Sequence, residues 1–89
     1  MITDDTICAI STAQGMGAIA VIRLAGPAAF QICESVFKPA KTGKILKQQP
    51  ANSIHFGTIH DGHKDLDEVL ISVFKAPHSF TGEDILEIA

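Results

Sequence analysis

The sequence has no tryptophan or tyrosine, only one arginine and only two cysteines. It also has no uninterrupted apolar run of about 20 residues, which excludes a membrane-spanning helix. The pattern G-x-x-x-x-G-K followed by Ser or Thr is missing, so we expect no nucleoside triphosphate to bind this chain through a P-loop. A formal net charge of -3 argues against a protein that coats nucleic acid duplexes with a broad basic surface.

The two cysteines, Cys8 and Cys33, are predicted to be free and buried. No secretory segment precedes them, which favours a reducing compartment and a cytoplasmic location. The residues at 1–5 are acidic and unlike a targeting peptide, so we expect Met1 to be the native start.

The length of 89 residues, of which 46% are hydrophobic, predicts one domain with a core of its own. No internal repeat or low-complexity segment divides the chain. The last apolar segment is followed by no Gly, Asn or Pro that would close an element. We therefore expect the chain, residues 1–89, to be an N-terminal domain cut before its last elements.

The hydrophobic pattern predicts five strands and one helix. Strands are expected at 6–11, 18–25, 52–59, 68–74 and 85–88, and an amphipathic helix from Pro27 to the break at Pro39. The unbroken apolar run at 18–25 predicts a central strand covered on both faces. The Asp61-Gly62 pair predicts a hairpin that makes the third and fourth strands antiparallel. The order β-β-α-β-β-β predicts an α+β fold with one mixed or antiparallel sheet.

Two charged residues stand out because they lie in apolar strand-like segments. Glu87 is set between Leu86 and Ile88, and Arg23, the only arginine, lies in the most hydrophobic segment. A buried carboxylate needs an arginine, backbone donors or a ligand, and a guanidinium needs an acceptor. The two could form a structural ion pair, or a pair of polar anchors in an apolar pocket, and the residues alone leave both readings open.

Three other motifs have simpler interpretations. The segment at 15–20 matches G-x-G-x-x-A, but a strand rather than a helix is predicted after it, so we interpret it as a turn. His60 and His63 lie across a hairpin turn without supporting ligands, which argues against a metal site. The regularly spaced lysines of 38–50 are interrupted by Pro39 and Gly43, which favours a solvated loop over a nucleic-acid contact.

The order of these motifs resembles the N-terminal domain of the MnmE (TrmE) family of tRNA-modification GTPases over essentially the whole chain. The most specific part is the run from Ala76 to Ile88. The motifs that carry the resemblance are Asp5-Thr6-Ile7, Gly15-x-Gly17, Ile22-Arg23-Leu24-x-Gly26, Asp67-Glu68-Val69-Leu70 and Ala76-Pro77-His78-Ser79-Phe80-Thr81-Gly82-Glu83-Asp84-Ile85-Leu86-Glu87-Ile88. The family commonly has a proline in the first loop where this chain has Ala13.

The resemblance implies a parent protein that acts with MnmG (GidA) to modify C5 of the wobble uridine of certain tRNAs. The parent would use GTP, Mg²⁺ and K⁺ in GTPase and helical domains that are absent from residues 1–89. The N-terminal domain would resemble the folate-binding domain of aminomethyltransferases, form a homodimer and bind 5-formyltetrahydrofolate or a related tetrahydrofolate.

The family's ligand-contacting positions carry over to Arg23 and Glu87, and a further lysine is expected beyond Ala89. No catalytic or metal-binding residue is implied here. We therefore expect folate to bind the intact domain, and this chain only weakly. Two alternatives remain: a dimerisation module in which Arg23 and Glu87 only pair with each other, and an aminomethyltransferase-like folate domain.

Overall fold

The computed structural model describes residues 5–10, 20–76 and 82–89. Strands β1 (Ile7–Ile10) and β2 (Ile22–Ala25) come first and are followed by helix α1 (Ala29–Val36). Next come β3 (Phe37–Pro39), the short 3₁₀ helix η1 (Leu46–Gln48), β4 (Ser53–His60), β5 (Asp65–Phe74) and β6 (Ile85–Ile88). The predicted α+β class is confirmed.

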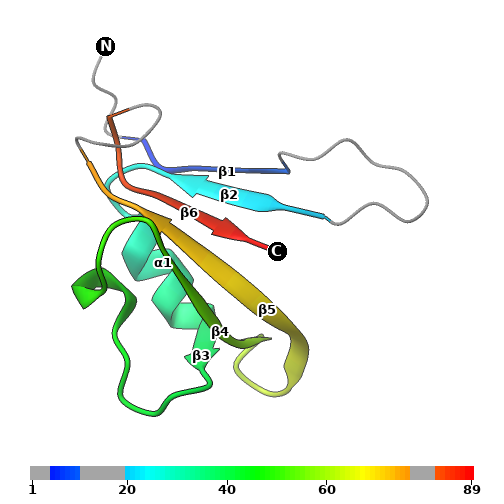
Figure 1. Ribbon diagram of the computed structural model, residues 1–89. Helices are drawn as coiled ribbons and strands as arrows, with labels where there is room; N and C mark the ends of the chain where they lie inside the picture. The colour runs from blue at the N-terminus through cyan, green and yellow to red at the C-terminus, as the bar shows by residue number, and fades with distance from the viewer. Residues whose placement is uncertain (1–4, 11–19, 77–81) are drawn as a thin grey trace.

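All six strands form one sheet in the order β1-β2-β6-β5-β4-β3, and every neighbouring pair is antiparallel. The last strand, β6, lies between β2 and β5 and joins the N-terminal strand pair to the other three strands (Figure 1). Backbone bonds between Leu70 and Ala89, both 3.0 Å, extend the β5–β6 ladder by one residue. The segment containing Glu87 is therefore enclosed by hydrogen-bonded strands on both sides.

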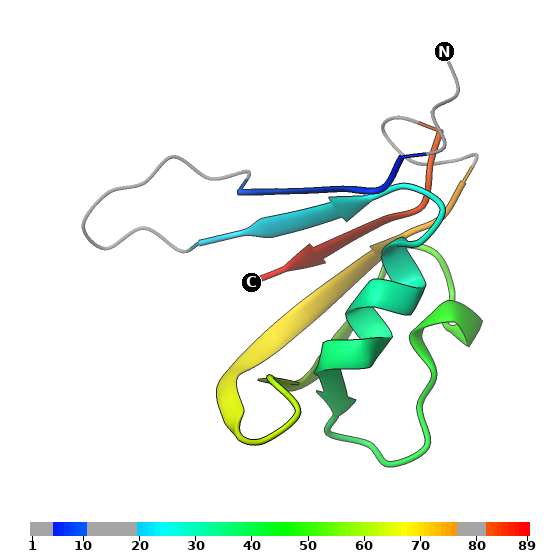
Figure 2. The same cartoon turned by 180° about the vertical axis from the view of Figure 1, so that it is seen from behind.

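Helix α1 lies on one side of this sheet, as the two opposite views show (Figures 1 and 2). Its start is held by residues that are distant in the sequence. The amide of Ala28 donates to Thr6 Oγ1 at 2.8 Å, and the amide of Gly26 donates to the Asp84 carbonyl oxygen at 3.0 Å. Gly26 has φ +131°, and a Cβ there would come within 2.6 Å of the Asp5 carbonyl oxygen, so the turn into the helix requires glycine.

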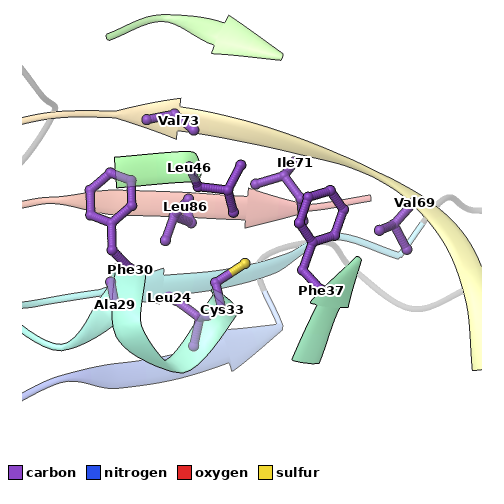
Figure 3. Packing of buried hydrophobic residues seen from close by; sticks show 10 residues of the cluster. All are labelled: Leu24, Ala29, Phe30, Cys33, Phe37, Leu46, Val69, Ile71, Val73 and Leu86. Carbon is purple, nitrogen blue, oxygen red and sulfur yellow. The ribbon is translucent and has the colours of Figure 1, made fainter. Parts of the chain in front are cut away.

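The core lies between α1 and the sheet. Phe30 and Cys33 of α1 pack against Ile71 and Leu86 of the sheet, and the ring of Phe37 joins the same cluster from β3 (Figure 3). The remaining buried members of the cluster are Leu24, Ala29, Leu46, Val69 and Val73.

Several predicted details were wrong. The helix begins two residues after Pro27, and Phe37 starts the unpredicted strand β3 instead of ending the helix. The loop predicted at 38–50 overlaps β3 and contains η1, and the segment between β3 and β4, residues 40–52, is here called the connector. β2 is second from the sheet edge, and its Ile22 is exposed, so it is not a central strand covered on both faces. Both thiols are free, but only Cys33 is buried, whereas Cys8 is exposed.

No helix among the described residues is long and apolar enough to cross a membrane.

Candidate binding site on the open face of the sheet

Arg23 and Glu87 are direct neighbours on adjacent strands. They are register partners in the antiparallel β2–β6 pair, so both side chains lie on the same face of the sheet. Arg23 Nη2 lies 3.6 Å from Glu87 Oε2. Leu24 and Leu86, the next pair along, belong to the core under α1. Arg23 and Glu87 must therefore lie on the opposite face, here called the open face, where each supplies the other with a partner of opposite charge.

The pair is partly exposed, with 36% of the Arg23 side chain and 21% of the Glu87 side chain accessible. An ion pair with this much water around it contributes about 1 kcal/mol or less to stability. Arg23 Nε is enclosed and has no acceptor within the described part of the chain. A buried donor without an acceptor costs free energy, so Arg23 is incompletely satisfied by Glu87 alone.

Ser72 is a third polar residue on this face. It is the register partner of Glu87 in the β5–β6 pair, which places Arg23, Glu87 and Ser72 in one row across three strands. We call this the polar row. Sequence reasoning missed Ser72, although the alternation of β5 could have identified it. Ser72 interrupts a run of apolar residues two positions from Leu70, on the same face of the strand.

Large apolar side chains flank the polar row. Leu70 and Phe56 are register partners on β5 and β4, and Ile54 faces Ser72. By the same alternation Ile7 of β1, paired with Ala25, lies on the open face at the other side. All four side chains are exposed: Ile7, Ile54, Phe56 and Leu70. The site is thus a small charged row within an apolar surface.

The hairpin histidines are organised by backbone contacts. The amide of Gly62 donates to His60 Nδ1 at 3.1 Å, and the amides of His63 and Lys64 donate to Asp61 Oδ1 at 2.8 and 2.9 Å. The two amide donors lower the pKa of Asp61, with that of Lys64 contributing most. Among the described residues no group of three or more His, Cys, Asp or Glu side chains is arranged to hold a metal ion.

A network that sequence reasoning missed joins the connector to β4. His55 is buried, its Nδ1 lies 3.0 Å from Lys44 Nζ, and its Nε2 lies 2.7 Å from Ser53 Oγ. Because an ammonium can only donate, Nδ1 accepts and Nε2 carries the proton that Ser53 Oγ receives. The Ser53 hydroxyl in turn donates to the Pro50 carbonyl oxygen at 2.5 Å. Both ring nitrogens of His55 are engaged, so the network holds the connector against β4 and leaves the imidazole with no free nitrogen to act as a base.

Some sequence motifs lie outside the described residues. These are the glycine-containing turn, up to Ile19, and residues 77–81 of the specific run near the C-terminus. Within the described remainder of that run, Asp84 Oδ1 accepts from the amide of Ala76 at 3.0 Å. Asp84 thus organises the backbone that leads into β6, as expected for a turn residue.

Comparison with known proteins gives consistent matches. The family model described as the N-terminus of the GTP-binding protein TrmE matches residues 6–89. A tRNA modification GTPase MnmE of Bacteroides thetaiotaomicron is 56% identical over 84 residues, which covers 94% of this chain and 18% of the relative. MnmE of Flavobacterium johnsoniae is 53% identical over 89 residues, covering 100% and 19%, and that of Bacillus subtilis is 50% identical over 86 residues, covering 94% and 18%.

The chain thus spans about a fifth of the length of the curated relatives that it matches. The match nevertheless extends over nearly all of its own residues, including both strands that carry Arg23 and Glu87. This chain belongs to the family of the TrmE N-terminal domain, the N-terminal part of the tRNA modification GTPase MnmE.

Proposed function

We propose that the chain serves as the tetrahydrofolate-binding and dimerisation part of a tRNA-modification GTPase. The whole protein would act with MnmG on C5 of the wobble uridine in tRNA, in the cytoplasm, and would hold GTP, Mg²⁺ and K⁺ in other domains. The relatives are named tRNA modification GTPases, which supports the overall activity. Our proposal also includes that the domain binds folate, that it forms a homodimer, and that it resembles the folate-binding domain of aminomethyltransferases.

The observation that carries the folate assignment is the polar row. A reduced pterin presents adjacent N–H groups on its pyrimidine ring, and a carboxylate can accept two of them in parallel. Glu87 is held in the middle of the sheet by β2 and β5, so its position is fixed before a ligand arrives. Arg23 would hold a carbonyl, a formyl oxygen or a carboxylate of the ligand, and a ligand acceptor would relieve its incomplete pairing.

The test is calorimetric titration of 5-formyltetrahydrofolate into a full-length protein that carries this chain. Glu87→Gln keeps the shape but removes the charged acceptor, so we expect a loss of about 1.5 to 3 kcal/mol, roughly 10- to 150-fold in affinity. Arg23→Lys keeps the charge but loses the planar fork, and it should also weaken binding.

Glu68→Gln is the matched control. Glu68 is exposed on the same face of β5, four residues from Ser72, and it is outside the polar row. Its substitution should leave folate affinity unchanged. If Glu87→Gln also leaves affinity unchanged, Arg23 and Glu87 form a structural pair, and the dimerisation module without a ligand is the better reading.

Dimerisation is proposed through the open face. Ile54, Phe56 and Leu70 form an exposed apolar area beside the polar row, and α1 covers only the other side of the sheet. An uncovered apolar face of this kind is typical of an interface between protein chains. A second copy would cover the apolar residues and bring a second polar row close to the first.

Light scattering of this chain at concentrations from about 10 µM upward should report a mass above that of the monomer. Self-association depends on concentration, so the mass should rise with it. Phe56→Asp should shift the equilibrium toward monomer by placing a charge in the interface. Ile32→Asp is the control, since Ile32 is equally apolar and exposed but lies on α1, on the opposite side of the sheet. A monomer at all these concentrations, or equal effects of the two substitutions, would contradict the open-face interface.

A further inference from the structure

Charge is unevenly divided between two segments at the β3–β4–β5 end of the sheet. The connector at 40–52, between β3 and β4, contains Lys41, Lys44 and Lys47 and no acidic residue. The hairpin at 61–68 contains four acidic residues and one lysine. A mobile anion therefore meets opposite fields at the two segments, and only the connector attracts it.

The connector also encloses a surface cavity of about 180 Å³, lined by Lys41, Thr42, Gly43, Lys44 and Gln49. No carboxylate lines it. One water occupies roughly 30 Å³ in the liquid, so the cavity has room for an oxyanion and some of its hydration water. The lining supplies two ammonium groups, one hydroxyl and several backbone amides.

Part of this donor set is already fixed in place. The amide of Lys44 donates to the Lys41 carbonyl oxygen at 3.4 Å and closes a turn over residues 41–44. Gly43 occupies the third position of this turn, with φ +85°. Lys44 Nζ is half-buried and bonded to His55, itself buried in β4. An ammonium has three N–H groups, so two remain for a ligand after the bond to His55. The lysine is thus positioned in advance, which reduces the entropy lost on binding.

Two further cavities that are lined by described residues differ from the connector cavity in charge. One contains Lys38 and Lys64 with the hairpin histidines, but Asp65 Oδ1 lies 2.7 Å from Lys38 Nζ and neutralises it. The other is lined by Asp65, Asp67 and Glu68 with Thr58 and Leu66, so it would repel an anion. Among these three cavities, the connector cavity is the one whose lining contains lysines and no carboxylate.

We propose that the connector cavity binds a phosphate group. Lysine acts as a point charge toward phosphate oxygens, and Lys41 and Lys44 together balance a group that carries one to two negative charges. The Thr42 hydroxyl and the amides of the turn would donate to the remaining oxygens. The group can be a phosphodiester of an RNA backbone or a free phosphate, and the two sources differ in the number of contacts that they offer beyond the cavity. Neither depends on folate binding by Arg23 and Glu87.

The experiment is a pair of NMR titrations that follow the amides of Thr42 and Gly43 in the ¹⁵N-labelled chain. One titration uses inorganic phosphate and the other a short single-stranded RNA, each matched by NaCl at equal ionic strength. Saturable shifts at these amides are expected with both probes and not with NaCl. Tighter binding of RNA would identify the phosphodiester as the ligand, and equal or tighter binding of phosphate would identify the free anion.

Lys41→Gln is the decisive variant because Lys41 is exposed and has no role in the His55 network. It should weaken RNA binding roughly three- to tenfold at low salt and reduce the slope of log affinity against log salt by about 0.7, the value for one phosphate contact on a single strand. Lys64→Gln on the hairpin is the matched control and should change neither.

Shifts that follow ionic strength alone would overturn the proposal, as would equal effects of Lys41→Gln and Lys64→Gln. A spectrum of Lys41→Gln that otherwise matches the original chain shows that the variant is folded, so a loss of binding then belongs to the cavity.

Discussion

The two faces of the sheet are built from the same strands but differ in almost every physical property. On the face under α1, Leu24, Ile71 and Leu86 are buried and pack against the helix. On the open face, at positions adjacent to these in the three strands, lie Arg23, Ser72 and Glu87, with exposed apolar side chains nearby. Alternation along a strand lets one short sequence serve both purposes.

The difference separates stability from recognition. Burial of apolar surface, the main favourable contribution to folding, is concentrated under the helix. The open face contributes less of it, since Ile54, Phe56 and Leu70 remain exposed and its ion pair is partly exposed, although Ile85, two residues before Glu87 on the same face of β6, is fully buried. The exposed residues of the open face can therefore be substituted with small losses of stability, which makes the proposed folate and dimer experiments interpretable.

The largest expected effect comes from two neighbouring residues of β5. Ile71 is 0% exposed under the helix, whereas Leu70 is 47% exposed on the open face. Ile71→Ala should lower the free energy of unfolding by about 2 to 5 kcal/mol, because it leaves a cavity in the core. Leu70→Ala should lower it by less than about 1 kcal/mol in the monomer, since the side chain is already hydrated.

Urea denaturation at low protein concentration measures both. If Ile71→Ala does not fold, Ile71→Val provides the comparison, with an expected loss of about 0.5 to 1.5 kcal/mol. Similar losses at positions 70 and 71 would show that the open face is also covered in solution, and the contrast between the faces would then be wrong.

A smaller effect is expected from pH. His55, on the helix side of β4, has a pKa lowered from 6.5, first by burial and second by the charge of Lys44. Protonation therefore favours the unfolded chain. The stability contributed by neutral His55 is fully present above about pH 6.5 and is lost as the pH falls through that value toward the pKa of the folded state.

Thermal denaturation at a series of pH values from about 7.5 to about 5, a range that brackets the 6.5 reference, tests this. His55→Gln cannot take up a proton and should flatten the pH dependence while lowering stability at neutral pH, because the contacts to Lys44 and Ser53 weaken. His63→Gln, at an exposed position of the hairpin, is the control and should leave the pH dependence unchanged. An unaltered pH dependence in His55→Gln would assign the effect to other groups.

The sequence predicted the parts of the fold whose signals are local. The bounds of β6, the hairpin at Asp61-Gly62 and the antiparallel pairing of β4 with β5 follow from short patterns and are confirmed. The pairing of Arg23 with Glu87 was also within reach, since each needed a partner of opposite charge in an apolar segment. Their roles toward a ligand stay a prediction.

Other features depend on distant contacts. Phe37 fits the helical spacing of α1, but it lies in β3 and its ring reaches the same core from there. Periodicity alone cannot distinguish a helical from a strand position for this residue. In β4 the apolar Ile54 and Phe56 are exposed while His55 and Gly57 are buried. A Cβ at Gly57 would collide with the Lys38 carbonyl oxygen and the Phe37 ring. The glycine leaves space for that ring, a requirement that only the assembled sheet imposes.

The smallest effect on stability, and the sharpest measure of where the helix cover ends, is expected from the two thiols. Cys8 is the register partner of Leu24, so it lies on the helix side of the sheet, yet it is exposed because α1 does not extend over β1. Cys33 is fully buried between α1 and the sheet, and burial, together with the nearby charge of Glu34, raises its pKa to about 12. Because the thiolate is the reactive form, Cys33 should resist alkylation while Cys8 reacts.

Iodoacetamide should label one thiol per chain in native buffer and two in denaturant, as counted by mass spectrometry. Cys8→Ser should abolish labelling in native buffer and should change the free energy of unfolding by no more than about 0.5 kcal/mol. Labelling of Cys33 at the rate of Cys8 would mean that the helix opens readily from the sheet, and the part of this face under α1 would then be no better protected than the uncovered strand β1.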